Sequence, residues 1–170
     1  MQRVLVMGPP GSGKSTLACR LGAARGLPVL HLDQAYWRPG WVEAPPAAFR
    51  AEVERFTAGP AWIIDGNYTP LALAPRLAAA DTAIVLDVPS WLATARVLRR
   101  ALGHRGRVRP DMAPGCPERL DPAFLRYTWS WNRRGRARTL ALLAGFPGRI
   151  VVLKGPAAAR RFLLAEATPR

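Results

Sequence analysis

The sequence is poor in cysteine and in long apolar runs, and both shortages exclude something. Its two cysteines, Cys19 and Cys116, have no metal-type spacing, so we expect neither a zinc site nor a disulfide framework. A reducing cytoplasm is the simplest compartment for such a chain. No apolar run is long enough to cross a bilayer, and the short stretch before Gly8 does not suit a signal peptide, so we expect no membrane partner.

Acidic residues and lysine are also scarce. The 25 cationic side chains outnumber 11 acidic ones, which gives a net charge of +14, and Lys14 and Lys154 are the only lysines. Twelve arginines lie between residues 96 and 138, against Asp111, Glu118 and Asp121 alone. Such a focused basic region attracts phosphates, whether they belong to a nucleotide or to a nucleic acid. Charge alone does not choose between these partners.

Short apolar runs alternate with helical patterns, which favours an α/β fold with a parallel sheet and crossover helices. The 170 residues suit one domain, with no repeat and no linker. We expect strands at residues 3–7, 28–32, 61–64, 82–86 and 149–153. We expect helices at residues 14–25, 47–57, 90–102, 122–143 and 157–165, with loops at 36–46 and 103–117.

The segment GPPGSGKS at residues 8–15 matches the Walker A pattern, and it lies between an expected strand and an expected helix. Its glycines let backbone N–H groups surround phosphate oxygens at the positive end of the helix dipole. Lys14 is expected on the β- and γ-phosphates, and the Ser15 hydroxyl on Mg²⁺. The candidate nucleotide-binding residues are Gly8, Gly11, Ser12, Gly13, Lys14, Ser15 and Thr16.

Three acids follow expected strands and should lie at the carboxyl edge of the sheet. For Asp33 we favour an acceptor-side catalytic role over a helix cap or a structural ion pair. For Asp65 we favour a magnesium role, because one acid is required beside the phosphate loop and Gly66 permits close approach of the backbone. A capping role suits Asp87 at least as well as a catalytic one.

Aromatic residues gather in the expected loops near the same edge. Tyr36, Trp37, Trp41 and Tyr68 could stack on a base or another planar acceptor, or could pack a small lobe against the core. The sequence leaves both readings open.

Several segments together resemble the adenylate-kinase-like nucleotide kinases, and most closely the DNA topology modulation (FlaR-like) proteins. They are the phosphate loop, HLD at residues 31–33, WRPGW at 37–41, DGNY at 65–68, LDVP at 86–89 and RVRPDM at 107–112, extended by GCPE at 115–118. The resemblance implies a P-loop NTPase fold in three layers, with sheet order 2-3-1-4-5. It also implies a substrate lobe at about residues 34–58 and a mobile, arginine-rich lid at about 103–120.

The resemblance also implies roles for single residues. Asp65 matches the acid that holds the magnesium shell, and Arg96 and Arg100 have the spacing of two catalytic, phosphate-clamping arginines. In related small-molecule kinases an acid at the place of Asp33 touches the acceptor. The chain departs from the family after Gly66, where residues 67–69 (NYT) replace the Phe-Pro-Arg segment that helps adenylate kinases bind the monophosphate.

The arginine-rich loop and the helix after it supply further candidates. Phosphoryl transfer depends on positioning and charge neutralisation, and a closing lid also excludes water. We expect Arg107 and Arg109 to bind the nucleotide and Arg134 and Arg138 to act in catalysis.

The leading hypothesis is a phosphotransferase that moves the γ-phosphoryl group of ATP, with Mg²⁺, to a nucleoside monophosphate or another small acceptor. The alternative is an ATP-dependent DNA-binding or topology-modulating regulator, although the sequence carries no helix-turn-helix or zinc motif. A bare NTPase is a third possibility. A monomer or a homodimer would suit any of them.

Overall fold

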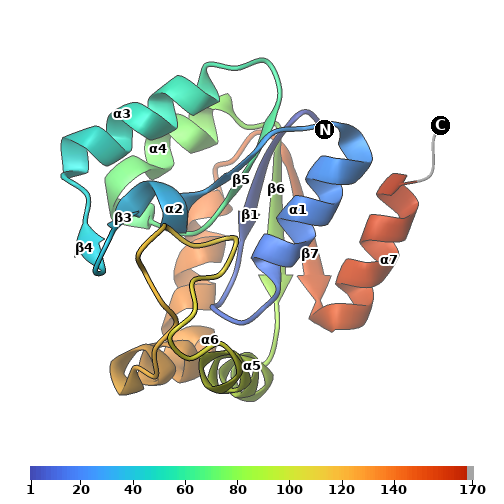
Figure 1. Cartoon of the computed structure of the whole chain (residues 1–170). Helices are drawn as coiled ribbons and strands as arrows, with labels where there is room; N and C mark the ends of the chain where they lie inside the picture. The colour runs from blue at the N-terminus through green and yellow to red at the C-terminus, as the bar shows by residue number, and fades with distance from the viewer. Residues whose placement is uncertain (168–170) are drawn as a thin grey trace.

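The computed structural model describes residues 1–167, and a central sheet of five parallel strands organises them (Figure 1). The strands are β1 (Arg3–Met7), β2 (Val29–His31), β5 (Trp62–Asp65), β6 (Thr82–Asp87) and β7 (Arg149–Lys154). Their order is β2-β5-β1-β6-β7, and every pairing is parallel. Numbered along the chain these strands are 2-3-1-4-5, so the predicted fold class is confirmed.

Helices cover both faces of the sheet, which explains why its central strands are apolar on both sides. On one face lie α1 (Lys14–Arg25) and α7 (Gly155–Ala167), where Leu17 and Leu21 pack with Val4 and Val6. The other face is covered by α3 (Pro46–Thr57), α4 (Thr69–Ala79) and the end of α6 (Pro122–Leu143). The result is the three-layer arrangement that the resemblance implied.

The carboxyl ends of the strands point towards α5 (Ser90–Gly103) and the first half of α6, at the bottom of Figure 1. Asp121 caps α6, because its Oδ1 accepts hydrogen bonds from the backbone N–H groups of Ala123 (2.8 Å) and Phe124 (3.2 Å). The turn before α1 approaches α5 closely, since a Cβ on Gly11 would clash with the carbonyl oxygen of Ala93. Only glycine fits this position of the phosphate loop.

Three short elements depart from the expected pattern. Residue 32 begins α2 (Leu32–Tyr36) rather than ending a strand, and the expected loop contains a hairpin of β3 (Trp37–Arg38) and β4 (Val42–Glu43). The interval between β5 and β6 contains α4, which the sequence analysis did not predict. Pro75 lies inside α4, and Ala72 has non-helical dihedrals there, so its pattern is irregular.

Within residues 1–167 no helix is long and apolar enough to cross a membrane.

Candidate active site

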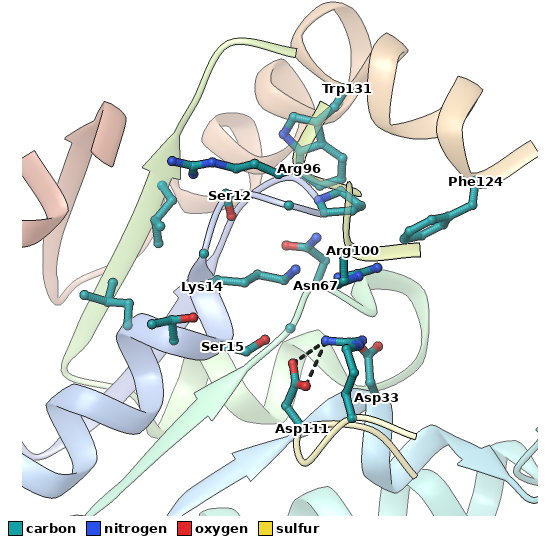
Figure 2. A pocket seen from close by; sticks show the side chains of 18 of the residues that line it. Ser12, Lys14, Ser15, Asp33, Asn67, Arg96, Arg100, Asp111, Phe124 and Trp131 are labelled. Carbon is teal, nitrogen blue, oxygen red and sulfur yellow. Dashed lines mark hydrogen bonds and ion pairs between the residues drawn. The ribbon is translucent and has the colours of Figure 1, made fainter. Parts of the chain in front are cut away.

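The phosphate loop opens into a cavity of about 1060 Å³ at the carboxyl edge of the sheet (Figure 2). Residues 10–17 form one wall, and α5, α6, α7, α2 and the loop between α5 and α6 supply the others. The cavity brings together these predicted residues: Gly11, Ser12, Gly13, Lys14, Ser15, Thr16, Asp33, Arg96, Arg100, Arg109, Arg134 and Arg138. Gly8, Asp65 and Arg107 do not line it.

Lys14 and Ser15 lie in the first turn of α1, where backbone N–H groups have no partner within the helix. In the described part of the chain no acid pairs with the Lys14 ammonium group. The hydroxyl of Ser12 is buried without a hydrogen-bond partner. A polar cradle of this kind favours a bound anion.

Asn67 fixes the loop to the sheet. Its Nδ2 donates to the Gly8 carbonyl (2.9 Å), and its Oδ1 accepts from the Gly8 N–H (3.2 Å). Gly8 therefore acts through the backbone beneath the cavity rather than on its wall. From the sequence, Asn67 entered as part of the DGNY segment and as a departure from the Phe-Pro-Arg pattern, and neither observation predicted this contact.

Asp33 reaches the cavity from the first turn of α2, not from the end of a strand as we expected, because β2 ends at His31. Its Oδ1 accepts a 2.7 Å hydrogen bond from the Tyr68 hydroxyl. Burial, followed by the charge of Asp33, raises the pKa of Tyr68 far above its ordinary value, so the phenol stays a donor. Tyr68 itself has φ 31°, a left-handed conformation that is unusual for a tyrosine.

Arg76 holds the backbone of this segment and was missed by the sequence analysis. It is 1% exposed and donates to the carbonyls of Gly66 (3.3 Å), Asn67 (2.8 Å) and Tyr68 (3.2 Å). Burial lowers its pKa to about 10. A lone charge among the alanines and leucines of residues 71–80 was the only signal in the sequence.

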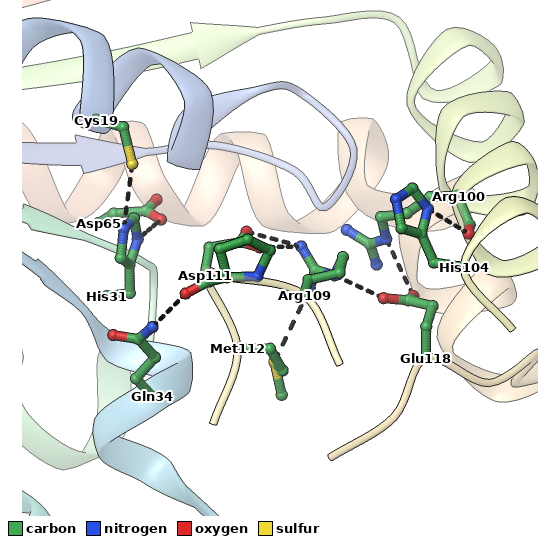
Figure 3. A network of polar contacts seen from close by, with 11 residues as sticks. Cys19, His31, Gln34, Asp65, Arg100, His104, Arg109, Asp111, Met112 and Glu118 are labelled. Carbon is green, nitrogen blue, oxygen red and sulfur yellow. Dashed lines mark hydrogen bonds and ion pairs between the residues drawn. The ribbon is translucent and has the colours of Figure 1, made fainter. Parts of the chain in front are cut away.

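Asp65 lies behind the cavity wall and, with the buried His31, forms a polar chain that ends at the exposed Cys19 (Figure 3). Nδ1 of His31 is 2.9 Å from Asp65 Oδ2, and Nε2 is 3.4 Å from the Cys19 sulfur. Burial acts to lower the pKa of His31, but the hydrogen bond and charge of Asp65 outweigh it and raise that pKa. Burial, with the charge of Asp65, raises the pKa of the Cys19 thiol.

Magnesium suits the residues that are present. The second oxygen of Asp65, Oδ1, is buried with no partner, and Ser15 contributes a hydroxyl on the cavity wall. Mg²⁺ prefers oxygen ligands and keeps several waters, so it needs few protein donors when substrate phosphates share it. Residues 1–167 contain no group of three or more His, Cys, Asp or Glu side chains that could hold a metal alone. These donors therefore fit a magnesium ion that arrives with a nucleotide.

An ion-pair network joins Arg100 of α5 to Arg109 of the loop between α5 and α6 (Figure 3). Arg109 donates to Glu118 Oε2 (2.6 Å) and to both oxygens of Asp111 (2.8 and 2.7 Å). Arg100 donates to the other oxygen of Glu118 (3.0 Å). Arg96, Arg134 and Arg138 have no such acidic partner among the described residues.

The same loop is fastened to α2 and the β3–β4 hairpin. Gly40 N–H donates to the Gly115 carbonyl (2.9 Å), and the Trp41 indole donates to the Pro117 carbonyl (3.1 Å). Gln34 donates to the carbonyl of Pro110 (2.7 Å), and the Cys116 thiol to that of Arg38 (3.1 Å). The loop that we expected to form a lid therefore packs against α2 and the β3–β4 hairpin.

Further residues line the cavity without having been singled out from the sequence. They are arginines and aromatic side chains of α1, α5, α6, α7 and the loop: Arg20, Arg99, Arg119, Phe124, Tyr127, Trp131 and Arg160. Of the expected aromatics, Trp37, Trp41 and Tyr68 line it, whereas Tyr36 packs on Phe49 beneath (ring centroids 5.3 Å apart).

The fold is that of solved kinases. A gluconokinase from Sinorhizobium meliloti 1021 matches with a TM-score of 0.57 at 17% identity, over 98% of this chain and 91% of that one. A sugar kinase from Janibacter sp. HTCC2649 matches with a TM-score of 0.53 at 18% identity, over 99% of each chain. The sequence matches no protein-family model and no curated protein. The P-loop kinase architecture is thus shown, whereas the closer likeness to FlaR-like proteins stays a prediction.

Proposed function

We propose that the protein is a P-loop kinase that transfers the γ-phosphoryl group of ATP, with Mg²⁺, to a small acceptor. The observation that carries the proposal is the single cavity that Lys14, Ser15 and the carboxylate of Asp33 share. A phosphate cradle and a candidate proton acceptor on facing walls are what an in-line transfer between two bound substrates needs.

The phosphate side would bind and neutralise the triphosphate. Backbone N–H groups of residues 11–15 and the positive end of α1 would receive the β-phosphate, and Lys14 would bridge to the γ-phosphate. Arg96, Arg134 and Arg138 line the same cavity and would take up negative charge that develops on the transferred group. When bound, Mg²⁺ would screen the phosphate oxygens, with the Ser15 hydroxyl as a ligand and the Asp65 carboxylate available to the waters that the ion keeps.

On the acceptor side, Asp33 would orient the attacking group and receive its proton. The hydrogen bond from Tyr68 restricts the rotation of this carboxylate, and Arg76 restricts the backbone of Tyr68. Arg100 and Arg109 would lie between the two substrates, held there by Glu118. We propose no nucleotide contact for Arg107, which does not line the cavity.

The resemblance to adenylate kinases suggests a nucleoside monophosphate as the acceptor. The fold likeness to sugar kinases suggests a hydroxylated metabolite instead. The names of the structural neighbours concern gluconate and sugars, so they support the second class and give no support to the first.

Seven of the twelve arginines between residues 96 and 138 line the cavity, which favours the kinase over the nucleic-acid-binding alternative. They are Arg96, Arg99, Arg100, Arg109, Arg119, Arg134 and Arg138. Arginines that face a nucleotide-sized cavity contribute less to an outer surface that could bind DNA.

The test is ATP consumption with Mg²⁺ against a panel of nucleoside monophosphates, nucleosides and sugars, with EDTA and Lys14→Ala as controls. One acceptor should accelerate ADP formation, and both controls should abolish that acceleration. If no acceptor raises turnover above basal hydrolysis and duplex DNA binds in a salt-sensitive way, the regulator hypothesis replaces the kinase.

A further inference from the structure

At the acceptor end of the cavity, four of six charged side chains already pair with one another. Three carboxylates lie there, those of Asp33, Asp111 and Glu118, together with the guanidinium groups of Arg100, Arg109 and Arg119. The Nε of Arg109 donates a hydrogen bond to Glu118, and its Nη1 donates to Asp111, at distances of 2.6 to 2.8 Å. Its side chain is 13% exposed and that of Glu118 is 7% exposed, so water screens this pair weakly.

An anionic acceptor would meet little net positive charge at this end, because three carboxylates balance three guanidinium groups. To turn its Nε and Nη1 towards a phosphate, Arg109 would have to leave two carboxylates, and the buried Glu118 would lose a charged partner. Arg119 has no acidic partner within the described residues, but its guanidinium lies 5.0 Å above the ring of Trp41, where a cation and an aromatic face attract each other. With Arg100 and Arg109 already paired, one such arginine gives a dianion little net attraction.

The walls of the same end are aromatic. Trp37 and Trp41 lie edge to face with centroids 5.5 Å apart, and Tyr68 adds a third ring. Phe124 and Tyr127 line the side contributed by α6 as a stacked pair, 6.2 Å apart. Rings of this kind bind planar, uncharged groups through stacking and burial of apolar area.

Asp33 provides a single polar anchor among these rings. Its Oδ1 is occupied by the Tyr68 hydroxyl, and no hydrogen bond within the described residues uses Oδ2. A carboxylate oxygen that is free and oriented can accept a hydrogen bond from a hydroxyl group.

We propose that the acceptor is an uncharged compound that carries a planar ring and a hydroxyl group, and that this hydroxyl is the group phosphorylated. The inference rests on the proposed kinase function and narrows its substrate. The hydroxyl oxygen forms a bond to the γ-phosphorus while the bond to the β,γ-bridging oxygen breaks, and ADP leaves. The hydroxyl proton passes to Asp33 Oδ2.

Matched pairs of a neutral and an anionic compound test the expected charge of the acceptor. Adenosine, guanosine, cytidine and thymidine are each compared with their 5′-monophosphates, and glucose with gluconate, by ADP formation and by calorimetric binding to protein loaded with a non-hydrolysable ATP analogue and Mg²⁺. We expect at least one nucleoside to bind and react at least tenfold better than its monophosphate. Glucose should bind more weakly than that nucleoside, because it lacks a planar ring.

A variant that removes the carboxylate of Glu118 tests whether ion pairing causes the preference for a neutral acceptor. Glu118→Gln frees Arg100 and Arg109 from a shared carboxylate, so the preference for nucleoside over monophosphate should fall at least tenfold. Asp87→Asn removes a carboxylate that pairs with Arg136 outside the cavity wall and should leave the preference unchanged.

The outcomes separate the two claims. Better use of a monophosphate or of gluconate by the unmodified protein overturns the inference and leaves the kinase function standing. Binding of the ATP analogue with no binding of any nucleoside also overturns the inference alone. If the ATP analogue itself does not bind, the proposed function fails, and the inference fails with it.

Discussion

The two ends of the cavity differ in how far their polar groups are satisfied. At the phosphate end, Lys14, Arg96, Arg134 and Arg138 carry charges without acidic partners in the described chain, and the Ser12 hydroxyl is buried and unpaired. At the acceptor end, Arg100 and Arg109 already pair with Glu118, and Arg109 also pairs with Asp111. This difference supports our proposals that one end binds an anion and that the other binds a neutral ligand.

The largest expected effect comes from removing the charge of Lys14, which tests the proposed role of the phosphate end. Lys14→Ala should lower kcat about 10³-fold, the upper range for loss of one preorganised charge-stabilising group. Steady-state ADP formation at saturating acceptor measures the loss.

Lys154 offers a matched control, because it is the only other lysine and it ends β7 as an exposed residue. Lys154→Ala should retain full turnover. Equal losses in the two variants would show that general charge, not the phosphate loop, supports activity.

The acceptor end is tested by Asp33→Asn. Loss of a proton-accepting carboxylate should lower kcat about 10²-fold, and the affinity for ATP should stay within about twofold, since Asp33 contacts no phosphate in our proposal. Tyr68→Phe keeps the ring and removes only the 2.7 Å hydrogen bond, so its loss in kcat should be smaller. A rise in the KM for ATP without a fall in kcat would show that Asp33 contacts ATP rather than the acceptor.

The position of the phosphate loop between a strand and a helix could be predicted, because the Walker A pattern occupies eight consecutive residues. The acceptor end could not, because its groups come from separate segments. Asp33 belongs to α2, Tyr68 precedes α4, and Glu118 lies in a loop with neither helical nor strand period. Their pairing depends on how the loop docks on the hairpin, which no local pattern records.

Arg76 shows the same limit in the fold itself. The sequence places it after a proline in an alanine- and leucine-rich stretch, where an exposed arginine is the ordinary expectation. It is buried because it donates to the carbonyl groups of residues 66–68. These tertiary contacts override the local pattern, whereas α4 was not predicted because Pro75 lies inside it and Ala72 is non-helical.

Arginines of α6 give a more moderate test of the phosphate end. Arg134→Gln should lower kcat and raise the KM for ATP, with a combined loss of roughly tenfold in kcat/KM, the usual cost of one hydrogen bond to a charged group, and with the acceptor KM unchanged. Arg133→Gln is the neighbouring control, because Arg133 is exposed and does not line the cavity. If both substitutions raise the KM equally, long-range attraction rather than contact explains the effect, and added salt should then remove it.

The smallest expected effect on turnover concerns Asp81, at the opposite edge of the sheet from the cavity. We expect this edge to have no role in catalysis. Asp81 Oδ2 accepts from the backbone N–H groups of Gln2 (2.9 Å) and Arg3 (2.8 Å), and Oδ1 accepts from the Thr82 hydroxyl (2.7 Å). Burial acts to raise the pKa of Asp81, but these hydrogen bonds outweigh it and lower the pKa below its usual value.

A carboxyl whose pKa is lower in the folded state contributes stability that is complete above its unfolded pKa, near 4, and that is lost as the pH falls through its folded pKa. Asp81→Asn should therefore lower the free energy of unfolding at pH 7 by about 1 kcal/mol and should weaken its dependence on pH below about 4. Urea unfolding at several pH values measures both. Turnover of the folded variant should match that of the unmodified protein, and a fall in kcat at pH 7 would mean that the two edges of the sheet are coupled.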